Sequence, residues 1–367
     1  MKVLDFLFMD LPPAIYITLF FVAGACIGTI LTRWIVVLTQ EENELSPPSE
    51  ISLDEKRHWS HHVPLLGYFL SRGRVSYRGE SIAGWGLLVE IGTGLLFAGF
   101  VAAKVIGKCQ DISEVQPDPL WWYGRIFYHL LLIGLLVAAT GTDFRDYTIP
   151  DQITLTGIGL GIAGAFLSGD LQMIHLWVDW NDEILGLRGP YIPEWLKAHR
   201  HWHGLAWSVT GMATGAAITW VGRAVSKLAL GREALGLGDV TLMAMIGSFV
   251  GWQPIIVIFS LAPICGLIVA LGLRVLFGHK FVPYGPFLSS STLAVLFFWR
   301  SIWTFRFHWS DRDAFSVSKI FSDALGLAIL LGIAFATLVL LLGIIRLYRN
   351  IPVKPRAEES KVDTTDE

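Results

Sequence analysis

The sequence is poor in charged residues. Asp, Glu, Lys and Arg make up only 16% of its 367 residues, whereas a soluble domain usually carries about 25%. Hydrophobic residues make up 53%, and the formal net charge is −3. Because nucleic-acid binding proteins carry basic surfaces, this balance gives no reason to expect a nucleic-acid partner. The composition instead predicts a protein that is embedded in a lipid bilayer.

Cysteine is also scarce, with only Cys26, Cys109 and Cys265 in the chain. The three are isolated from one another, and two of them lie inside apolar runs. A disulfide framework needs several paired cysteines, and a structural zinc site usually needs Cys-x-x-Cys spacing. Both are therefore excluded, and no metal site is expected.

Long apolar runs take the place of the missing charge. The run at 14–31 is too long for a signal peptide, so we expect it to be kept as a first span. Since a bilayer core requires about 20 apolar residues per helix, the sequence predicts an all-α polytopic membrane protein with about nine transmembrane helices. The expected spans are 13–33, 83–106, 123–142, 153–168, 206–224, 239–251, 253–273, 285–300 and 323–345.

The distribution of Lys and Arg predicts the orientation. If the N-terminus lies outside, 17 of these residues fall on the cytoplasmic side and 11 on the other. The clusters "SRGRVSYRG" and "RLYRN" lie close to span ends, where positive charge favours the cytoplasm. We therefore expect the N-terminus outside and the C-terminus in the cytoplasm.

The spans divide the chain into segments of different character. The expected organisation is a first span at 1–33, a cytoplasmic domain at 34–82, a membrane core at 83–300 with an outward loop at 169–205, an outward loop and extra C-terminal span at 301–345, and a cytoplasmic tail at 346–367. The tail alternates basic and acidic residues, which predicts disorder.

Two aspartates stand at the same expected membrane depth. Asp143 ends the third span and Asp239 begins the sixth, both on the cytoplasmic side. Two adjacent carboxylates cannot both ionise easily, so such a pair shares a proton. One can then accept a proton from water while the other protonates a scissile carbonyl, as in an aspartic protease. Gly236 and Gly238 would let the backbone approach a peptide substrate closely.

Two other interpretations fit the same residues. Asp239 alone could cap its helix, because Asp is a favoured N-cap residue, and Asp143 could be an interfacial charge beside Arg145. Alternatively, a membrane transporter or channel could use an acidic pair as a proton or cation site. Spacing alone does not choose between these possibilities and a protease.

Three sequence motifs resemble those of the prepilin peptidases. "TDFRDYTIPDQIT" at 142–154 is similar to their first motif, in which an Asp is followed by an aliphatic residue, Pro and Asp. "EALGLGDVTLMAMIGSFVGW" at 233–252 is similar to their Glu-Ala-hydrophobic-Gly-x-Gly-Asp motif, and "VPYGPFL" at 282–288 to their Pro-Phe-Gly-Pro segment. Upstream, 61–97 resembles their N-terminal cytoplasmic domain and the span after it, and "GACIGTILTR" at 24–33 the end of their first span.

The resemblance implies an intramembrane aspartic endopeptidase of the bacterial inner membrane. Such enzymes remove the leader of type IV prepilins and of type II secretion pseudopilins at the cytoplasmic face, without a metal or an organic cofactor. It implies that Asp143 and Asp239 are the catalytic pair. The residues that would shape the substrate site are Gly236, Gly238, Pro150, Asp151, Pro283, Gly285 and Pro286.

One part of the family pattern is missing. Many members also methylate the new N-terminus with S-adenosylmethionine and carry two Cys-x-x-Cys pairs in the N-terminal cytoplasmic domain. Here no cysteine occurs in 27–108, and Val75 and Arg78 occupy the second pair's positions. A tetrathiolate zinc site is therefore impossible. Whether methylation is retained stays open, with the region marked by Arg72, Arg74 and Glu90 as its expected place.

Overall fold

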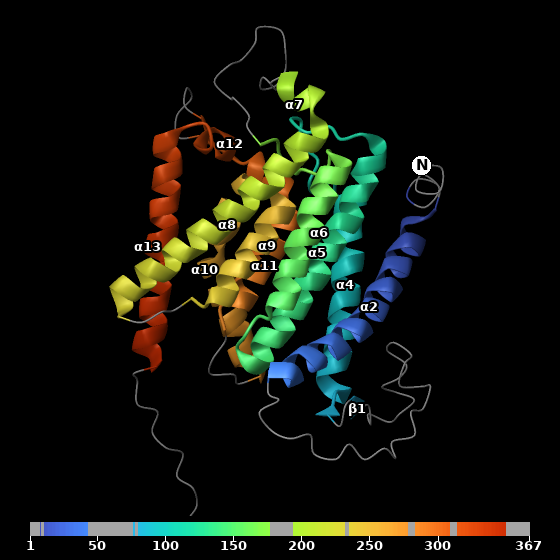
Figure 1. Cartoon of the computed structure of the whole chain (residues 1–367), viewed down its shortest axis with the longest axis vertical. Helices are drawn as coiled ribbons and strands as arrows, with labels where there is room; N and C mark the ends of the chain where they lie inside the picture. Colours follow the sequence, from blue (N-terminus) through green and yellow to red (C-terminus); the bar gives the residue numbers. More distant parts are fainter. Residues whose placement is uncertain are drawn as a thin grey trace, which may run out of the picture.

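The chain folds into a bundle of long helices (Figure 1). The computed structural model describes residue 8 and residues 11–42, 76–77, 80–176, 194–231, 235–277, 283–308 and 314–349. The long helices are α2 (Pro13–Glu42), α4 (Ala83–Val105), α5 (Pro119–Asp146), α6 (Asp151–Ser168), α8 (Arg200–Leu230), α9 (Leu237–Val250), α10 (Trp252–Phe277), α11 (Gly285–Trp303) and α13 (Ala324–Arg349).

The remaining elements in the described ranges are short. They are two antiparallel hairpins and two helices of one turn or little more: β1 (Ser76–Tyr77) with β2 (Glu80–Ser81), β3 (Arg306–His308) with β4 (Ala314–Ser316), α7 (Glu194–Ala198) and α12 (Val317–Ile320). The prediction of an all-α fold is confirmed, since the strands form no layer of their own.

Each of the nine predicted spans coincides with one long helix, although some helices are longer than the apolar run. The helix over the first span continues to Glu42, and α8 begins at Arg200. Four helices are long and apolar enough to cross a membrane: Pro13–Gln40, Gly84–Val105, Pro119–Asp146 and Ala324–Leu341. Helices α9 and α10 contain shorter apolar segments. The membrane character is therefore confirmed, while the number of spans and their orientation remain predictions.

Helix α5 is the centre of the bundle. In its apolar window 72% of the residues are buried, against 17% in α13. It contacts α2, α4, α6, α9 and α11. Figure 1 shows α13 at one edge of the bundle and α2 at the other, with α5 between them. Helix α5 is therefore packed against other helices on several sides.

Glycines allow α8 and α9 to touch through their backbones. A Cβ atom added to Gly211 would lie 2.1 Å from the carbonyl oxygen of Gly247, and one added to Gly247 would lie 2.1 Å from that of Gly211. A Cβ on Gly215 would lie 2.2 Å from the carbonyl oxygen of Met243. Small residues at a four-residue spacing favour such close helix contacts in membranes. Helix α9 is therefore held tightly against α8.

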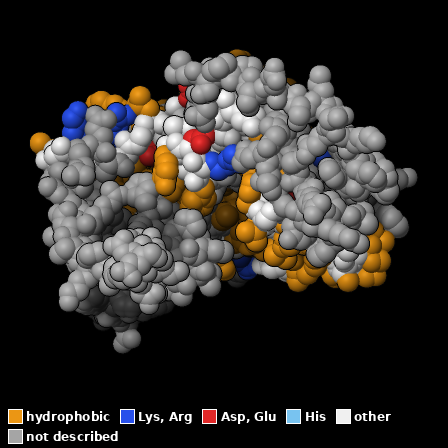
Figure 2. Space-filling view, turned by 90° about the horizontal axis from the view of Figure 1, so that it is seen from below, with side chains coloured by type: hydrophobic (Ala, Val, Ile, Leu, Met, Phe, Trp, Pro, Cys, Tyr) orange, Lys and Arg blue, Asp and Glu red, His pale blue; other side chains and the backbone are white. Residues whose placement is uncertain are grey.

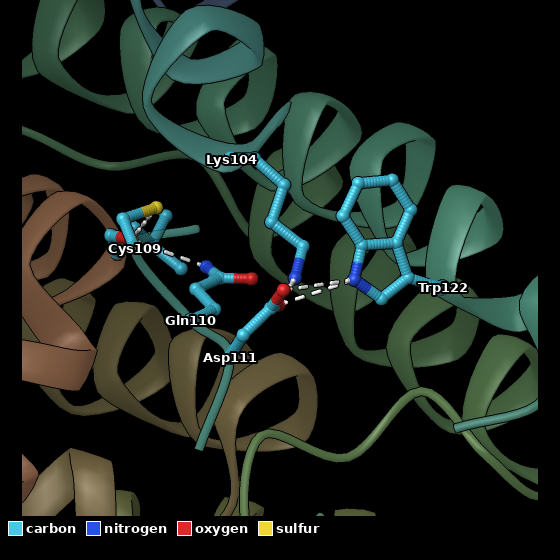
Figure 3. Close-up of polar contacts among 6 residues, drawn as sticks. Lys104, Cys109, Gln110, Asp111 and Trp122 are labelled. Carbon is cyan, nitrogen blue, oxygen red and sulfur yellow. Dashed lines mark hydrogen bonds and ion pairs between the residues drawn. The ribbon is translucent and has the colours of Figure 1, made fainter. Parts of the chain in front are cut away.

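A buried polar cluster ties α4 to α5 at the end of the bundle where α5 begins (Figure 3). The ammonium group of Lys104 is fully buried and forms an ion pair with Asp111, which also accepts a hydrogen bond from Trp122 Nε1 at 3.1 Å. The Lys104 ammonium lies 4.7 Å from the centre of the Trp122 ring. The connection between the two helices is thus fastened by charge as well as by packing.

The same connection is fastened to α11. Gln110 Nε2, drawn in Figure 3, donates a hydrogen bond to the carbonyl oxygen of Leu296 at 3.1 Å. The amide of Arg300 donates to the carbonyl oxygen of Cys109 at 2.7 Å. Burial raises the pKa of the Cys109 thiol to about 11. All three cysteines are free, as the sequence predicts, and Cys109 is an inert buried thiol.

Candidate active site

Asp143 lies in the last turn of α5. The helix ends because Tyr147 adopts a left-handed conformation with φ 56°, and its amide donates a hydrogen bond to the carbonyl oxygen of Asp143 at 3.1 Å. This is a helix C-cap. The Asp143 residue is only 5% exposed, so its carboxylate points into the bundle. The helix end therefore fixes the backbone of Asp143 while its side chain is enclosed.

The first residue of α11 holds the carboxylate of Asp143. The amide of Gly285 donates a hydrogen bond to Asp143 Oδ2 at 3.1 Å. A Cβ atom on Gly285 would lie 2.3 Å from that oxygen, which is shorter than any real contact of this kind. Glycine is required here because the backbone itself is a ligand of the carboxylate.

Asp239 is the third residue of α9. Its Oδ2 atom accepts a hydrogen bond from the amide of Gly236 at 2.8 Å, and the residue is 7% exposed. Gly236, rather than Asp239, is the N-cap residue of α9. The carboxylate reaches back to the helix start like the acidic residue of a capping box. Asp239 thus stabilises the first turn and is buried at the same time.

Ile149 lies between the segments that carry the two aspartates. A Cβ on Gly285 would lie 3.1 Å from Ile149 Cδ1, and a Cβ on Gly238 would lie 3.1 Å from Ile149 Cβ. The charge of Asp143 also acts on Asp239. The structure therefore brings these two carboxylates, far apart in the sequence, into one buried site between α5, α9 and α11. Ile149 packs beside Gly238, at the place where the sequence predicts that a peptide substrate approaches the backbone.

Two further residues interact electrostatically with Asp239 or lie in the field of its charge, and reasoning from sequence did not single them out. Arg223 of α8 interacts electrostatically with Asp239, and the hydroxyl of Tyr284 lies within the influence of its charge. In the sequence, Arg223 contributes only to the count of Lys and Arg residues that predicts the orientation. Tyr284 lies inside the "VPYGPFL" motif, which is the one signal that could have drawn attention to it.

The other residues of the predicted site lie around it with different roles. Pro150 is buried and is the N-cap residue of α6, whereas Asp151 is exposed in the first turn of that helix. A carboxylate in a first turn interacts favourably with the helix dipole. Pro283 and Pro286 are both buried, and Pro286 lies in the first turn of α11. Asp151 is thus exposed, whereas Pro150, Pro283 and Pro286 are buried.

The expected methyltransferase region is described only in part. Glu90 of α4 accepts a hydrogen bond from Thr29 Oγ1 of α2 at 2.9 Å, and so joins two helices. Arg72 and Arg74 lie outside the described residues. Within the described ranges no group of three or more His, Cys, Asp or Glu residues is placed to bind a metal ion.

The two aspartates lie toward one end of the bundle. Helix α5 ends and α9 begins in the lower half of Figure 1. Figure 2 views the molecule from below, and described hydrophobic side chains lie there beside a few acidic and basic ones. A membrane protein has such mixed surface where it leaves the bilayer, and Asp143 and Asp239 are buried at that end.

This arrangement has the parts that acid–base cleavage needs. Two buried carboxylates interact, each has one oxygen fixed by a backbone amide, and a cation and a phenol lie near one of them. When two such groups share one proton, the ionised carboxylate can take a further proton from water while the protonated carboxyl gives its own proton to a carbonyl oxygen.

Comparison with known proteins gives two family matches. The family described as "Type IV leader peptidase family" matches residues 130–271, and "Bacterial Peptidase A24 N-terminal domain" matches residues 22–104. The first match contains both Asp143 and Asp239. Together the two matched segments make up more than half of the chain. No solved structure matches it.

Curated relatives from several bacteria share one name. The "Prepilin leader peptidase/N-methyltransferase" of Aeromonas salmonicida (strain A449) is 28% identical over 231 residues, which are 62% of this chain and 63% of the relative. The protein of that name from Xanthomonas campestris pv. campestris is 26% identical over 260 residues, 70% and 73% of the two chains. The one from Pseudomonas putida is 25% identical over 320 residues, 79% and 93%. The chain thus spans less than two thirds of the length of the Aeromonas salmonicida relative.

Proposed function

We propose that this chain, which belongs to the type IV leader peptidase family, is an intramembrane aspartic endopeptidase. Its substrates would be type IV prepilins or type II secretion pseudopilins, whose leader peptide it removes. The observation that carries the proposal is the buried pair of Asp143 and Asp239 inside the family match. The relatives named prepilin leader peptidase support the choice of substrate.

The proposed chemistry uses the pair as one acid and one base. The ionised carboxylate takes a proton from water, whose oxygen attacks the scissile carbonyl carbon, while the protonated carboxyl gives its proton to the carbonyl oxygen. The tetrahedral intermediate then collapses and the C–N bond breaks. The leaving amine takes up the proton that came from water, and one hydroxyl of the intermediate returns its proton to the pair, which restores the starting state. The pair titrates as a unit, so the two roles are not divided between the residues.

The proposed location is the bacterial inner membrane with the site on the cytoplasmic side. The excess of Lys and Arg on one side supports that orientation. Cleavage there would fall at the membrane end of the substrate's hydrophobic helix. The alternative of a transporter or channel is not favoured, because the relatives that match are named as leader peptidases.

N-methylation of the new N-terminus is a second candidate function, with S-adenosylmethionine as the methyl donor. The relatives are named as both leader peptidase and N-methyltransferase, and the match to the N-terminal domain covers residues 22–104. The absence of cysteine from 27–108 means that this activity would require a metal-free form of the domain.

The test is cleavage of a cognate prepilin in membranes that contain the full chain. We expect Asp143→Asn and Asp239→Asn each to leave the prepilin uncleaved, because each removes one half of the acid–base pair. Asp118→Asn is the matched control, since it changes an exposed aspartate at the opposite end of α5. Processing at the normal rate in either site variant would refute the proposal. Mass spectrometry of the product shows whether its N-terminus is methylated.

A further inference from the structure

The hydroxyl of Tyr284 is buried without a partner. The residue is 8% exposed, and the part of the chain that the structure describes offers its oxygen no hydrogen bond. Buried hydroxyls nearly always have a partner, and exceptions call for an explanation, such as a catalytic role. Burying an unpaired hydroxyl costs free energy, so its presence here requires a reason other than stability.

The ring of Tyr284 is held firmly in place. Tyr284 is the N-cap residue of α11, and its carbonyl oxygen accepts a hydrogen bond from the amide of Phe287 at 2.9 Å. The two rings pack edge to face with their centres 5.6 Å apart. Because the backbone and the ring are both fixed, the hydroxyl is directed to one place rather than free to find another partner.

That place is the active site. The next residue, Gly285, donates its amide hydrogen to Asp143, and the hydroxyl lies within the influence of the Asp239 charge. Burial first, and the Asp239 charge second, raise the pKa of the Tyr284 hydroxyl well above its usual range. The group therefore keeps its proton and is a donor at every working pH.

The other groups that face Asp239 have different properties. Asp143 from α5 carries negative charge, and Arg223 from α8 carries positive charge. Of these three, Tyr284 is the neutral donor whose proton does not belong to the shared pair. The resembling Pro-Phe-Gly-Pro segment has Phe where this chain has Tyr284, so the hydroxyl is an addition to the motif.

We propose that Tyr284 is a catalytic residue whose hydroxyl donates a hydrogen bond to the carbonyl oxygen of the peptide bond that is cleaved. The missing partner of the hydroxyl is then the substrate. As water adds to the carbonyl carbon, negative charge grows on this oxygen, and a fixed donor stabilises the tetrahedral intermediate more than the substrate. The inference rests on the proposed peptidase function and adds the Tyr284 hydroxyl to the two aspartates as a third catalytic group.

The test compares the full chain with its Tyr284→Phe variant on a cognate prepilin. Phe keeps the ring and removes only the donor. We expect kcat to fall by about tenfold or more with KM nearly unchanged, because the hydrogen bond strengthens in the transition state. The melting temperature should stay the same or rise, because the variant removes an unpaired buried hydroxyl.

Tyr128→Phe is the matched control. This tyrosine is also buried, but its hydroxyl donates to the carbonyl oxygen of Gly161 at 2.7 Å and lies near that of Ser248 at 3.2 Å. It precedes Asp143 by fifteen residues of α5, or about 22 Å. The control should lower the melting temperature and leave kcat of the folded enzyme unchanged, which is the opposite pattern.

The possible results are distinguishable. If the unaltered chain does not cleave the prepilin, the peptidase function itself is wrong. If it cleaves and Tyr284→Phe has the same kcat, the role given to Tyr284 is wrong. A raised KM with unchanged kcat, or a lower melting temperature with normal kcat per folded enzyme, would also overturn it, because the hydroxyl would then serve substrate binding or the fold.

Discussion

Gly285 is the residue on which the position of the Asp143 carboxylate depends. Its amide donates to Asp143 Oδ2, and the missing side chain leaves room for that oxygen. Ile149 lies near the same side of this glycine and also packs against Gly238 of α9. A single methyl group at this point would therefore disturb the contact between the two halves of the site.

We predict that Gly285→Ala abolishes most of the proposed leader peptidase activity. The added Cβ would stand 2.3 Å from Asp143 Oδ2, so the carboxylate must move and lose the amide hydrogen bond. A misplaced catalytic group can cost about 100-fold in rate. The measurement is kcat on a prepilin, with circular dichroism to show that the helices remain.

Gly159→Ala in α6 is the control for that change. A Cβ there would meet nothing within 4 Å, so activity should be retained. Equal activity of the Gly285→Ala and unaltered proteins would mean that Asp143 is not held by this amide during catalysis.

At the scale of elements, the position of Asp239 depends on how α9 packs. Helix α9 contacts α8 through Gly211 and Gly247, whose backbones touch. On another side of α9, Gly157 of α6 leaves room for the Met245 side chain. A Cβ atom added to Gly157 would lie 2.3 Å from Met245 Sδ. The position of this short helix therefore depends on close contacts that glycines of the neighbouring helices allow.

We predict that Gly211→Ala destabilises the protein by about 1–3 kcal/mol. Its Cβ would overlap the Gly247 carbonyl oxygen at 2.1 Å, so α8 and α9 must separate. Thermal unfolding in detergent measures the effect, and Gly332→Ala in α13 is the control because its Cβ would meet nothing within 4 Å. A melting temperature equal to that of the control would contradict the close contact.

At the scale of the whole molecule, the two ends of α5 serve different purposes. Its C-terminal end carries Asp143 in the candidate active site. Its N-terminal end is fastened through Trp122 to Asp111 and the buried Lys104. The bundle thus has charged groups at both ends of α5, an ion pair at its N-terminal end and the Asp143–Asp239 pair at its C-terminal end.

We predict that Lys104→Met lowers the free energy of unfolding by about 3 kcal/mol. The change leaves Asp111 without its cation, and that carboxylate is only 30% exposed. The double variant Lys104→Met/Asp111→Leu should recover much of the loss, because neither charge remains. Chemical denaturation compares the three proteins. If the double variant were less stable than the single one, the ion pair would not be the source of the effect.

The sequence by itself determined the helical membrane architecture, because a bilayer imposes a length of apolar chain that can be read directly. It also identified Asp143 and Asp239 through their motifs, although pattern alone left a helix cap and a transport site as alternatives. The helix boundaries were less certain, since α2 and α8 extend into polar residues that tertiary packing keeps helical.

Only the tertiary structure decided which residues surround the pair. The contact of Gly285 with Asp143, the position of Ile149 beside Gly285 and Gly238, the effect of Arg223 on Asp239 and the effect of Asp239 on Tyr284 join segments from five places in the chain. Periodicity describes neighbours along one helix, whereas such contacts depend on how separate helices pack. For that reason the sequence could name the carboxylates and place Gly236 and Gly285 in the site, but not show that the amides of these glycines hold the carboxylates.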